Sequence, residues 1–425
     1  MKIQYKDYKD KILGCLYGKN IGGTLGAPFE CYRGVYDVTF YTQDTSKPIP
    51  NDDVDLQLVW LRAVELEKGR LDSHVLAEYW STYISASLSE YGTGKNNFRM
   101  GIRPPLSGHL RNRNRDSNGA WIRTEIWACL AAGHPDVAVR YALEDAMVDH
   151  SGEGVYSAIF LAAMQSAAFV ESDPYKLISI GLSYIPEDCG ITKGVHTVME
   201  CKEKGMDWKQ ARKALFQAVP GSFGMMGGYY KGQIPEEDVP VGENGYDAPS
   251  NVGIIIIGLL YGEGDFGRSI CLATNCGEDT DCTAGSLGAL LGIISGKSNL
   301  PEKWVKGCSD EISTWCLRID AALRLMLLFN SYIIWEWRSK KIVNWICLRR
   351  SISMQMINEF PRRLPIWKRN WEPEIRSRKF FPNLLSMNLP CRIGLSRIRE
   401  VKSLWQLQAN AGPLSRHNLD LCPVT

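Results

Sequence analysis

The chain has 425 residues, with 45% apolar and 23% charged side chains, values that exclude a disordered or fibrous protein and allow a large buried core. Its formal net charge of +2 neither indicates nor excludes a nucleic-acid partner. The thirteen cysteines include no Cys-x-x-Cys pair, which argues against a disulfide framework or a zinc site and favours free thiols. The amino terminus lacks the apolar run of a signal peptide, and the longest apolar runs are too short to span a bilayer. We therefore expect a cytoplasmic protein without a membrane partner.

Helical patterning dominates the chain from its amino terminus onward. Residues 55–69 place apolar side chains three and four positions apart, and residues 72–89 repeat this spacing. Residues 156–170 are apolar nearly all round, as in a helix buried inside a bundle. Residues 284–294 carry Gly and Ala at positions that would let another helix backbone approach closely. No sustained strand alternation occurs, so the sequence predicts an all-α fold.

Two segments break the helical pattern. Residues 99–118 are rich in Pro, Gly, Asn and Arg and predict a long surface loop, a kind of segment that is often functional. Residues 220–250 are rich in Gly and also read as a loop.

The carboxy-terminal segment differs from the rest in charge. Residues 1–330 contain 32 Lys and Arg against 41 Asp and Glu, whereas residues 331–425 contain 17 against 6. Six tryptophans lie in this basic segment, and no period of 2 or 3.6 residues is found there. We assign residues 1–330 to one helical domain and residues 331–425 to a basic, Trp-rich tail. The tail is an accessory domain, a disordered extension or sequence that did not evolve as a fold. Aromatic and basic residues together suit single-stranded nucleic acid, but without a recognisable motif we do not expect that partner.

The first cluster of candidate functional residues is Asn51-Asp52-Asp53, followed closely by Asp55. Asn and Asp are favoured at helix N-caps and in first turns, so capping alone explains part of this cluster. Three carboxylates within four residues exceed what one cap requires, however. They repel one another unless a cation lies among them.

The second cluster spans residues 277–285, where Glu278, Asp279 and Asp281 precede the small-residue helix. Capping is again the alternative interpretation. Buried carboxylates need a counter-charge, and few basic residues lie nearby in the sequence. Two acidic helix starts brought together would form an oxygen-rich site that suits Mg²⁺ or Mn²⁺ better than Zn²⁺. We therefore predict that the carboxylates of the two clusters converge in space.

Five motifs occur in the order found in the ADP-ribosylglycohydrolase family, which the chain resembles over roughly residues 8–300. The motifs are GGTLGAPFE (22–30), NDDVDLQL (51–58), SNGAWIR (117–123), HSGEGVYSA (150–158) and GEDTDCTAG (277–285). They are similar to the Gly-Asp-Ala-Leu-Gly…Glu, Thr-Asp-Asp-Thr, Gly-Asn-Gly, His-Ser and Gly-Gly-Asp-Thr-Asp-Thr elements of the family. The two acidic motifs are the specific part of the resemblance.

The resemblance implies a compact orthogonal helical bundle with two divalent metal ions, Mg²⁺ or Mn²⁺, in a cleft. It also implies hydrolysis of the glycosidic bond between ADP-ribose and an acceptor, so the expected partner is an ADP-ribosylated protein or a small ADP-ribosyl conjugate. The implied metal ligands are Asn51, Asp52, Asp53, Asp279, Asp281 and Cys282. The implied substrate-binding residues are Ser117, Asn118, Gly119, His150 and Ser151. Glu30 matches an acidic residue that acts at the scissile bond or gates the cleft in some members, and Asp55 is the second candidate for the catalytic carboxylate.

Several positions depart from the family pattern and indicate a divergent branch. Asn51 replaces a hydroxyl ligand, although its amide oxygen can still bind a hard cation. Cys282 replaces another hydroxyl with a soft thiol, and Thr283 is the alternative ligand. Gly23 stands where many members have Asp, and Glu278 adds a carboxylate where Gly is usual.

The residues suit glycoside chemistry at a metal centre. Two metal ions can hold vicinal ribose hydroxyls and lower the pKa of a bound water, and a carboxylate can stabilise an oxocarbenium-like transition state. Arg111, Arg113 and Arg115 are candidates for binding a diphosphate, with solvated loop charge as the alternative. For His150, a hydrogen-bonded core histidine is the alternative to a substrate contact.

The leading hypothesis is therefore a metal-dependent hydrolase of ADP-ribosyl or related nucleotide-sugar conjugates. The first alternative is a non-catalytic ADP-ribose-binding or structural relative, which Asn51 and Cys282 favour and the retained aspartates oppose. The second is a hydrolase of free nucleosides, against which the Arg-rich segment argues because its charge suits a diphosphate.

Overall fold

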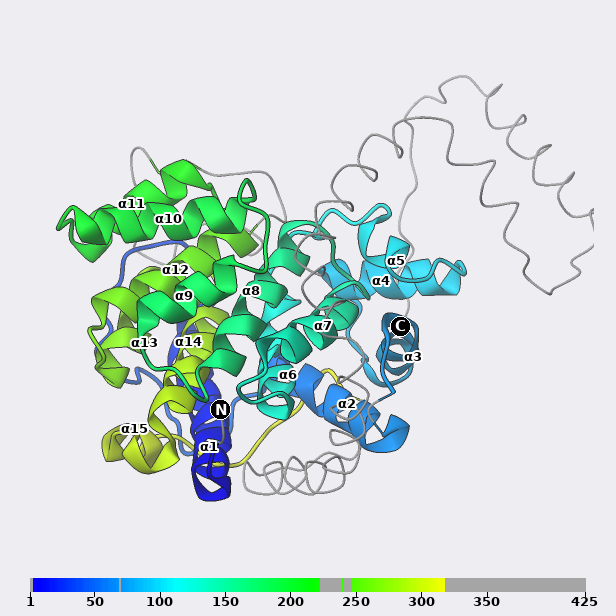
Figure 1. Ribbon diagram of the computed structural model, residues 1–425, viewed down its shortest axis with the longest axis horizontal. Coiled ribbons are helices and arrows are strands. Elements are labelled where there is room, and N and C mark those ends of the chain that lie inside the picture. Colours follow the sequence, from blue (N-terminus) through cyan, green and yellow to red (C-terminus); the bar gives the residue numbers. More distant parts are fainter. Residues whose placement is uncertain (1–2, 69, 222–238, 241–246, 318–425) are drawn as a thin grey trace, which may run out of the picture. The chain divides into compact units, whose positions relative to one another are not determined.

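The structure is a computed structural model that describes residues 3–68, 70–221, 239–240 and 247–317 (Figure 1). Over these residues the chain forms helices and no β-strand, which confirms the predicted all-α class; its extended pairings are isolated bridges between Tyr32 and Glu278 and between Ile84 and Leu317. The α-helices are α1 (Tyr5–Gly26), α2 (Asp52–Glu67), α3 (Ser73–Tyr83), α4 (Ser89–Arg99), α5 (Leu106–His109), α6 (Glu125–Leu130), α7 (Pro135–Ala146), α8 (Glu153–Ala167), α9 (Pro174–Leu182), α10 (Gly190–Glu203), α11 (Trp208–Ala218), α12 (Ala248–Tyr261), α13 (Phe266–Asn275), α14 (Thr280–Ser295) and α15 (Glu302–Lys306). The 3₁₀ helices are η1 (Ala27–Phe29), η2 (Trp121–Arg123) and η3 (Lys297–Asn299).

Local sequence explains most helix boundaries. The N-cap Asn51 of α2 accepts a hydrogen bond from the backbone N–H of Asp53, and α2 ends at Lys68, which has a positive φ of 54°. The apolar pattern of residues 72–89 extends beyond the real helix. Helix α3 stops at Tyr83 because Ile84, although buried, is extended and pairs with Leu317.

Helices α1 and α14 pack backbone against backbone because glycines lie every four residues along their contact. A Cβ added at Gly18 would lie 2.0 Å from the carbonyl oxygen of Gly288, and one at Gly22 would lie 2.0 Å from that of Ala284. Only glycine permits so close an approach. The close packing predicted for the small-residue helix is therefore found, with α1 as the partner.

This packing places two helix ends together. The contacts of Gly14 with Gly292 and of Gly26 with Thr280 show that α1 and α14 run antiparallel. The carboxy-terminal end of α1 therefore lies beside the amino-terminal start of α14, where the second acidic cluster begins. The start of α2 joins them, since a Cβ at Gly23 would contact the Asn51 side chain.

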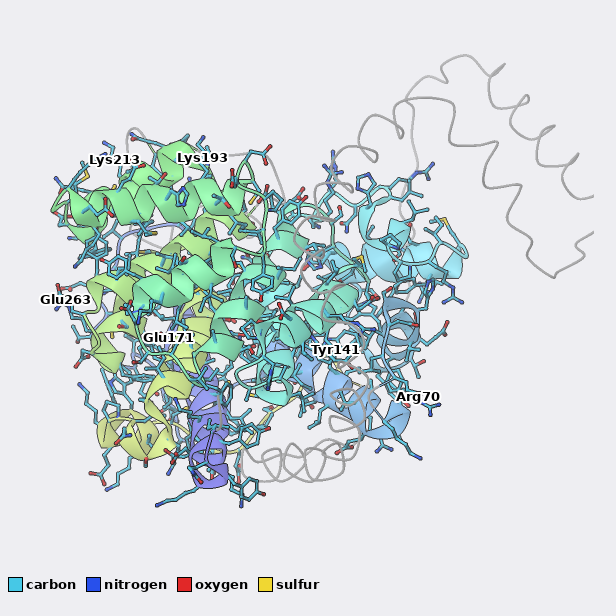
Figure 2. All side chains as sticks on the ribbon, in the orientation of Figure 1. Arg70, Tyr141, Glu171, Lys193, Lys213 and Glu263 are labelled. Carbon is cyan, nitrogen blue, oxygen red and sulfur yellow. The ribbon has the colours of Figure 1, made fainter. Side chains whose placement is uncertain are left out.

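The core surrounds two apolar helices. Every residue of α12 is buried, as are thirteen of the fifteen residues of α8. Charged residues such as Lys193, Lys213 and Glu263 lie on the outside of the helical body (Figure 2). No helix in the described part of the chain is long and apolar enough to cross a membrane.

The two segments predicted as loops differ from that prediction in part. Within residues 99–118 the chain forms the short helix α5 and buries Ser107, Asn112 and Asp116, because hydrogen bonds with neighbouring backbone satisfy these polar groups. In the second segment, residues 222–238 and 241–246 lie outside the described residues, and α12 already begins at Ala248. The tail, residues 331–425, also lies outside the described residues, so its boundary and structure stay predictions.

Candidate metal centre

Three helix ends bring the acidic residues together. Glu30 follows η1 at the end of α1, Asp53 lies in the first turn of α2, and Asp279 and Asp281 lie at the start of α14. The carboxylates form two groups, each with its ligand atoms within 4.8 Å of one another. We call Glu30, Asp279 and Asp281 the Glu30 group, and Asp53, Asp281 and Cys282 the Asp53 group. The clusters that are more than two hundred residues apart in sequence thus converge, with Asp281 shared between the groups.

Asn51 and Asp52 border both groups. The Asn51 amide Nδ2 donates to Asp281 Oδ2 at 3.2 Å while its Oδ1 caps α2, so capping and site contact coexist in one side chain. A Cβ at Gly23 would lie 2.9 Å from this Nδ2, so a larger residue at position 23 would require the Asn51 side chain to shift. Tyr91 Oη donates to Asp52 Oδ2 at 2.7 Å. Burial and repulsion from Asp53 raise the pKa of Asp52 to about 6.

Asp53 is almost fully buried and has two unusual neighbours. Its Oδ2 lies 2.7 Å from the ammonium of Lys19, as an ion pair rather than a well-aligned hydrogen bond. Its Oδ1 accepts from Cys282 Sγ at 3.3 Å. Burial raises the pKa of the Asp53 carboxyl, and Lys19 opposes that rise.

The Glu30 group has no such cation. Among the described residues, no Lys, Arg or His forms an ion pair with Glu30, Asp279 or Asp281. Repulsion from Asp281, followed by burial, raises the pKa of Glu30 to about 9. Burial and Glu30 raise the pKa of Asp279 to about 7, and burial with Asp279 and Asp53 raises that of Asp281 well above its usual value. The group is therefore electrostatically incomplete without a cation.

The side chains of Cys282 and Thr283 point to different partners. Cys282 Sγ lies in the Asp53 group, and burial raises the pKa of its thiol. Thr283 Oγ1 donates to the carbonyl oxygen of Thr280 in its own helix. This geometry favours Cys282 over Thr283 as the side chain that faces a metal ion.

Asp55 lies apart from the two groups. It is fully buried, and its Oδ2 accepts from the backbone N–H groups of Trp315 and Cys316 at 2.9 and 3.0 Å. Burial raises the pKa of its carboxyl. Of the two candidate catalytic carboxyls, the structure places Glu30 with the acidic residues and uses Asp55 to hold a distant backbone segment.

The predicted substrate segment reaches the acidic site through Asn118. Its Nδ2 donates to Asp279 Oδ2 at 2.7 Å, while Trp121 Nε1 donates to its Oδ1 at 3.0 Å. Gly119 leaves space for a neighbouring carboxyl, because an added Cβ would lie 2.3 Å from Glu90 Oε1. Ser117, Asn118 and Gly119 therefore form a strip directly beside the start of α14.

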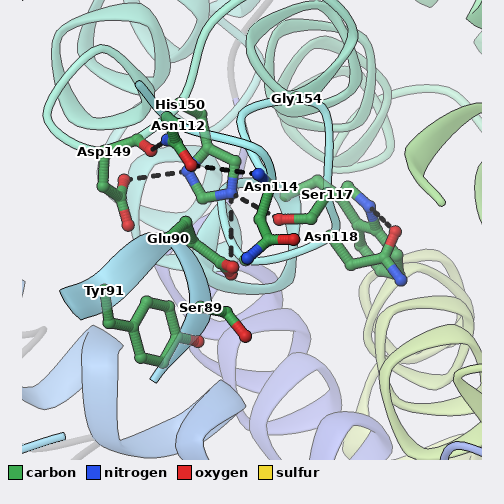
Figure 3. A network of polar contacts seen from close by, with 12 residues as sticks. Ser89, Glu90, Tyr91, Asn112, Asn114, Ser117, Asn118, Asp149, His150 and Gly154 are labelled. Atoms are coloured by element: carbon green, nitrogen blue, oxygen red, sulfur yellow. Dashed lines mark hydrogen bonds and ion pairs between the residues drawn. The ribbon is translucent and has the colours of Figure 1, made fainter. Parts of the chain in front are cut away.

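His150 lies behind this strip, fully buried (Figure 3). Its Nδ1 is 2.9 Å from Asp149 Oδ1, and its Nε2 is 3.2 Å from Ser117 Oγ and 3.7 Å from Glu90 Oε1. Both ring nitrogens have protein partners, which favours a role in positioning Ser117. Ser151 Oγ instead contacts His109 Nδ1 at 3.2 Å.

The arginines of the same segment differ in environment. Arg111 and Arg113 are exposed. Arg115 is partly exposed, with its Nε 3.1 Å from Asp116 Oδ2 and its Nη1 3.3 Å from His109 Nδ1. Arg115 is therefore already held beside the 150–154 motif, whereas the other two are solvated.

Sequence reasoning missed the buried partners of the site. Lys19, Glu90, Tyr91 and Glu125 belong to no motif that we recognised, although Lys19 and Glu125 each lie within three residues of one. Glu278 was expected to add charge to the second acidic cluster. Its carboxylate is instead paired with Arg33 Nε at 2.5 Å, and it belongs to neither group.

The family model described as ADP-ribosylglycohydrolase matches residues 4–332. The chain belongs to the ADP-ribosylglycohydrolase family. A solved structure titled "ADP-ribosylglycohydrolase-related protein complex" has 18% sequence identity and a TM-score of 0.52, and the match covers 78% of this chain and 99% of that chain. At this identity the likeness shows the fold, which agrees with the helical bundle described above. Comparison with curated proteins gives no match.

Membership of the ADP-ribosylglycohydrolase family indicates glycosyl hydrolase activity and an ADP-ribosylated substrate. Four carboxylates that the resemblance implies for the site, Glu30, Asp53, Asp279 and Asp281, lie close together in this structure.

Proposed function

We propose that this protein is a divalent-metal-dependent hydrolase of the glycosidic bond between ADP-ribose, or a related nucleotide-sugar, and an acceptor. The observation that carries the proposal is the convergence of the Glu30 and Asp53 groups from three helix ends. Carboxylates with raised pKa values and no paired cation are a candidate functional site, because stability alone would not select such repulsion.

The residues fit hard divalent cations such as Mg²⁺ or Mn²⁺. The donor set is rich in carboxylate oxygens, and Asp281 Oδ1 is buried with no hydrogen-bond donor among the described residues. Two divalent ions would be held by the groups together with Asn51 and Asp52. When bound, they would supply Lewis-acid chemistry toward ribose hydroxyls and water.

The remaining residues have positioning roles in this proposal. Glu30 is the exposed carboxyl of its group, so it is the candidate to act at the anomeric carbon or to orient water. The strip Ser117–Gly119 would contact the ribose and phosphates, since Asn118 links it to Asp279. His150 would orient Ser117, and Ser151 would hold the adjacent motif through His109. Asp55 would tie α2 to the backbone at Trp315 and Cys316.

The direct test is release of ADP-ribose from a panel of ADP-ribosylated acceptors by the full-length protein with Mg²⁺ or Mn²⁺. We expect metal-dependent release that a chelator abolishes and that Asp281→Asn lowers by about a hundredfold or more. Asp265→Asn is the matched control, because it makes the same change at the start of α13 and Asn remains a good N-cap. Absence of release from every acceptor with either metal would contradict the proposal.

The soft donor at position 282 favours one alternative, a relative that binds ADP-ribose without turnover. Cys282→Thr would restore a hard oxygen donor without adding charge. For an active enzyme we expect this variant to improve Mg²⁺-dependent release relative to Mn²⁺-dependent release. A protein that binds ADP-ribose but stays inactive both before and after the change would support the binder.

A further inference from the structure

The ammonium of Lys19 lies at the base of the Asp53 group. It is 4% exposed and comes from α1, beside Gly285 and Ser286 in the second turn of α14. Its Nζ is 2.7 Å from Asp53 Oδ2 and 3.3 Å from Glu125 Oε1. It also donates to the Ile122 carbonyl oxygen at 2.8 Å and to Ser286 Oγ at 2.9 Å. A metal-site carboxylate is thus already paired with a fixed cation of the protein.

The contacts hold this ammonium in place. Two of its three N–H groups donate to the Ile122 carbonyl oxygen and to Ser286 Oγ, and the carboxylates of Asp53 and Glu125 form ion pairs with it. The carboxylates of Asp53 and Glu125, at 2.7 and 3.3 Å, are the counter-charges that a buried ammonium requires.

The same contacts extend into a buried network. Gln57 Nε2 donates to Glu125 Oε2 at 3.0 Å, and Gln165 Nε2 donates to Glu125 Oε1 at 3.1 Å. Each oxygen of Glu125 therefore accepts from an amide, and Oε1 also lies 3.3 Å from the Lys19 ammonium. These amides hold Glu125 in place beside the cation.

The two groups consequently offer a divalent ion different environments. The Glu30 group presents three carboxylates and no paired cation from the part of the chain that the structure describes. The Asp53 group presents a lysine-paired carboxylate, a thiol that donates to that same carboxylate, and the shared Asp281. A divalent ion beside Asp53 would meet the repulsion of the ammonium and a soft donor, whereas one in the Glu30 group would meet hard anionic donors alone.

We infer that Lys19 serves as the resident cation of the Asp53 group and makes the centre unequal, with one tight divalent site at the Glu30 group and a weak one at Asp53. The inference rests on the metal centre of the proposed function, and it concerns how many ions that centre holds tightly. Lys19 is then a positioning residue that sets the metal affinity of the second site.

Substitution of Lys19, which lines a small cavity at the metal centre, tests the inference. Lys19, Gly23, Asn51 and Asp53 line this cavity together. Lys19→Met keeps most of the side-chain volume and removes the charge, so that a second divalent ion would become the only cation near Asp53. Lys19→Gln is the second variant, because its amide can still donate to the acceptors that the ammonium leaves.

The experiment is Mn²⁺ titration of the full-length protein by calorimetry, with electron paramagnetic resonance spectra at one and two equivalents. For the wild-type protein we expect one tight ion and a second that binds about tenfold or more weakly, with an isolated-ion spectrum. In Lys19→Met and Lys19→Gln the second ion should tighten about tenfold or more, and the spectrum at two equivalents should become that of a coupled pair.

Lys11→Met is the matched control on the same helix. Its ammonium donates to the carbonyl oxygens of Ile293 and Ile294, at the far end of α14 from the acidic residues. This variant should bind Mn²⁺ as the wild-type protein does.

The outcomes separate the two proposals. Two ions that bind the wild-type protein with equal affinity would overturn the inference. Folded Lys19 variants whose second site keeps the wild-type affinity for Mn²⁺ would also overturn it. Either result would still be consistent with the proposed metal centre. No Mn²⁺ binding to any of these proteins would contradict the proposed function itself.

Discussion

Asp149 and Asp281 are both buried carboxylates, with exposed fractions of 0% and 4%, yet their surroundings are opposite. Asp149 Oδ1 lies 2.7 Å from Arg123 Nη2 and 2.9 Å from His150 Nδ1. Burial alone would raise the pKa of Asp149, but Arg123 and His150 more than offset it and lower the pKa to about 2. Asp281 has other carboxylates as its charged neighbours, and its pKa is raised.

This difference separates a structural acidic cluster from a functional one. Arg123 also pairs with Asp145 at 2.9 Å, and Trp127 Nε1 donates to the second oxygen of Asp145 at 2.8 Å. We call Arg123, Asp145 and Asp149 the Arg123 cluster. Its charges are satisfied inside the protein, whereas those of the Glu30 group require a cation from outside. The Glu30 group, whose carboxylates have no paired cation among the described residues, is therefore the stronger candidate for a divalent ion.

The largest effect is expected at the Arg123 cluster. Arg123→Met should lower the free energy of unfolding by about 3–5 kcal/mol, because it leaves two buried carboxylates without their cation. Urea denaturation measures this change. Arg62→Met is the control, since Arg62 is half exposed and its removal should change stability by roughly 0.5 kcal/mol or less. A similar cost for both variants would show that Arg123 does not hold its cluster.

At the Glu30 group we expect a gain in stability when a divalent metal ion is added. Divalent metal at a hundred times its dissociation constant should stabilise the folded protein by about 2.7 kcal/mol. Asp281→Asn should remove most of this response, yet the metal-free variant should be no less stable than the wild-type protein because one repelling charge is gone. Melting curves with Mg²⁺, with Mn²⁺ and with chelator check both parts. Melting that neither metal changes would count against a metal enzyme.

The parts of these clusters that could be predicted are those whose interacting residues lie close together in the sequence. Residues 51–55 and 277–285 were recognised because a run of carboxylates is visible locally, and the helices that follow them have clear periodicity. Their relation to Lys19 was not visible, because the α1–α14 packing that places it opposite Ser286 joins residues more than two hundred and fifty positions apart. The ion-pair partner of Glu278 was not visible for the same reason, since Arg33 is 245 residues away. The end of α3 was missed because the pairing of Ile84 with Leu317 is tertiary.

Asp279 of the Glu30 group and Asp149 of the Arg123 cluster should also give opposite dependences on pH. The pKa of Asp279 is about 7 in the folded protein against an ordinary 3.8, so between these values the unfolded state loses its proton first. Stability of the metal-free protein should therefore fall as pH rises through this range. Asp149, with its lowered pKa of about 2, should cost stability only as pH falls from about 4 toward 2. Urea denaturation in chelator at several pH values tests both signs.

Asp279→Asn isolates the contribution of the Glu30 group to this pH dependence. The variant should flatten the decrease in stability between about pH 4 and 7, because the neutral amide does not titrate. Asp265→Asn, at the start of α13, should leave the slope unchanged. Identical slopes for Asp279→Asn and the wild-type protein would show that this carboxyl is not the group responsible.

The smallest effect is expected from deleting residues after about 335. The described helices end before residue 318 and the family match ends at residue 332, so both clusters lie within the retained chain. The free energy of unfolding and the response to Mn²⁺ should change by no more than roughly 0.5 kcal/mol. Insoluble truncated protein, or loss of the metal response, would show that the tail completes the fold.

The central distinction between the two clusters is tested most directly by anomalous diffraction from crystals of the full-length protein grown with Mn²⁺. We predict an anomalous peak among the carboxylates of Glu30, Asp279 and Asp281 and none beside Asp145 and Asp149, where Arg123 already supplies the positive charge. A protein saturated with Mn²⁺ that shows no peak at the Glu30 group, or shows one at the Arg123 cluster, would contradict this account.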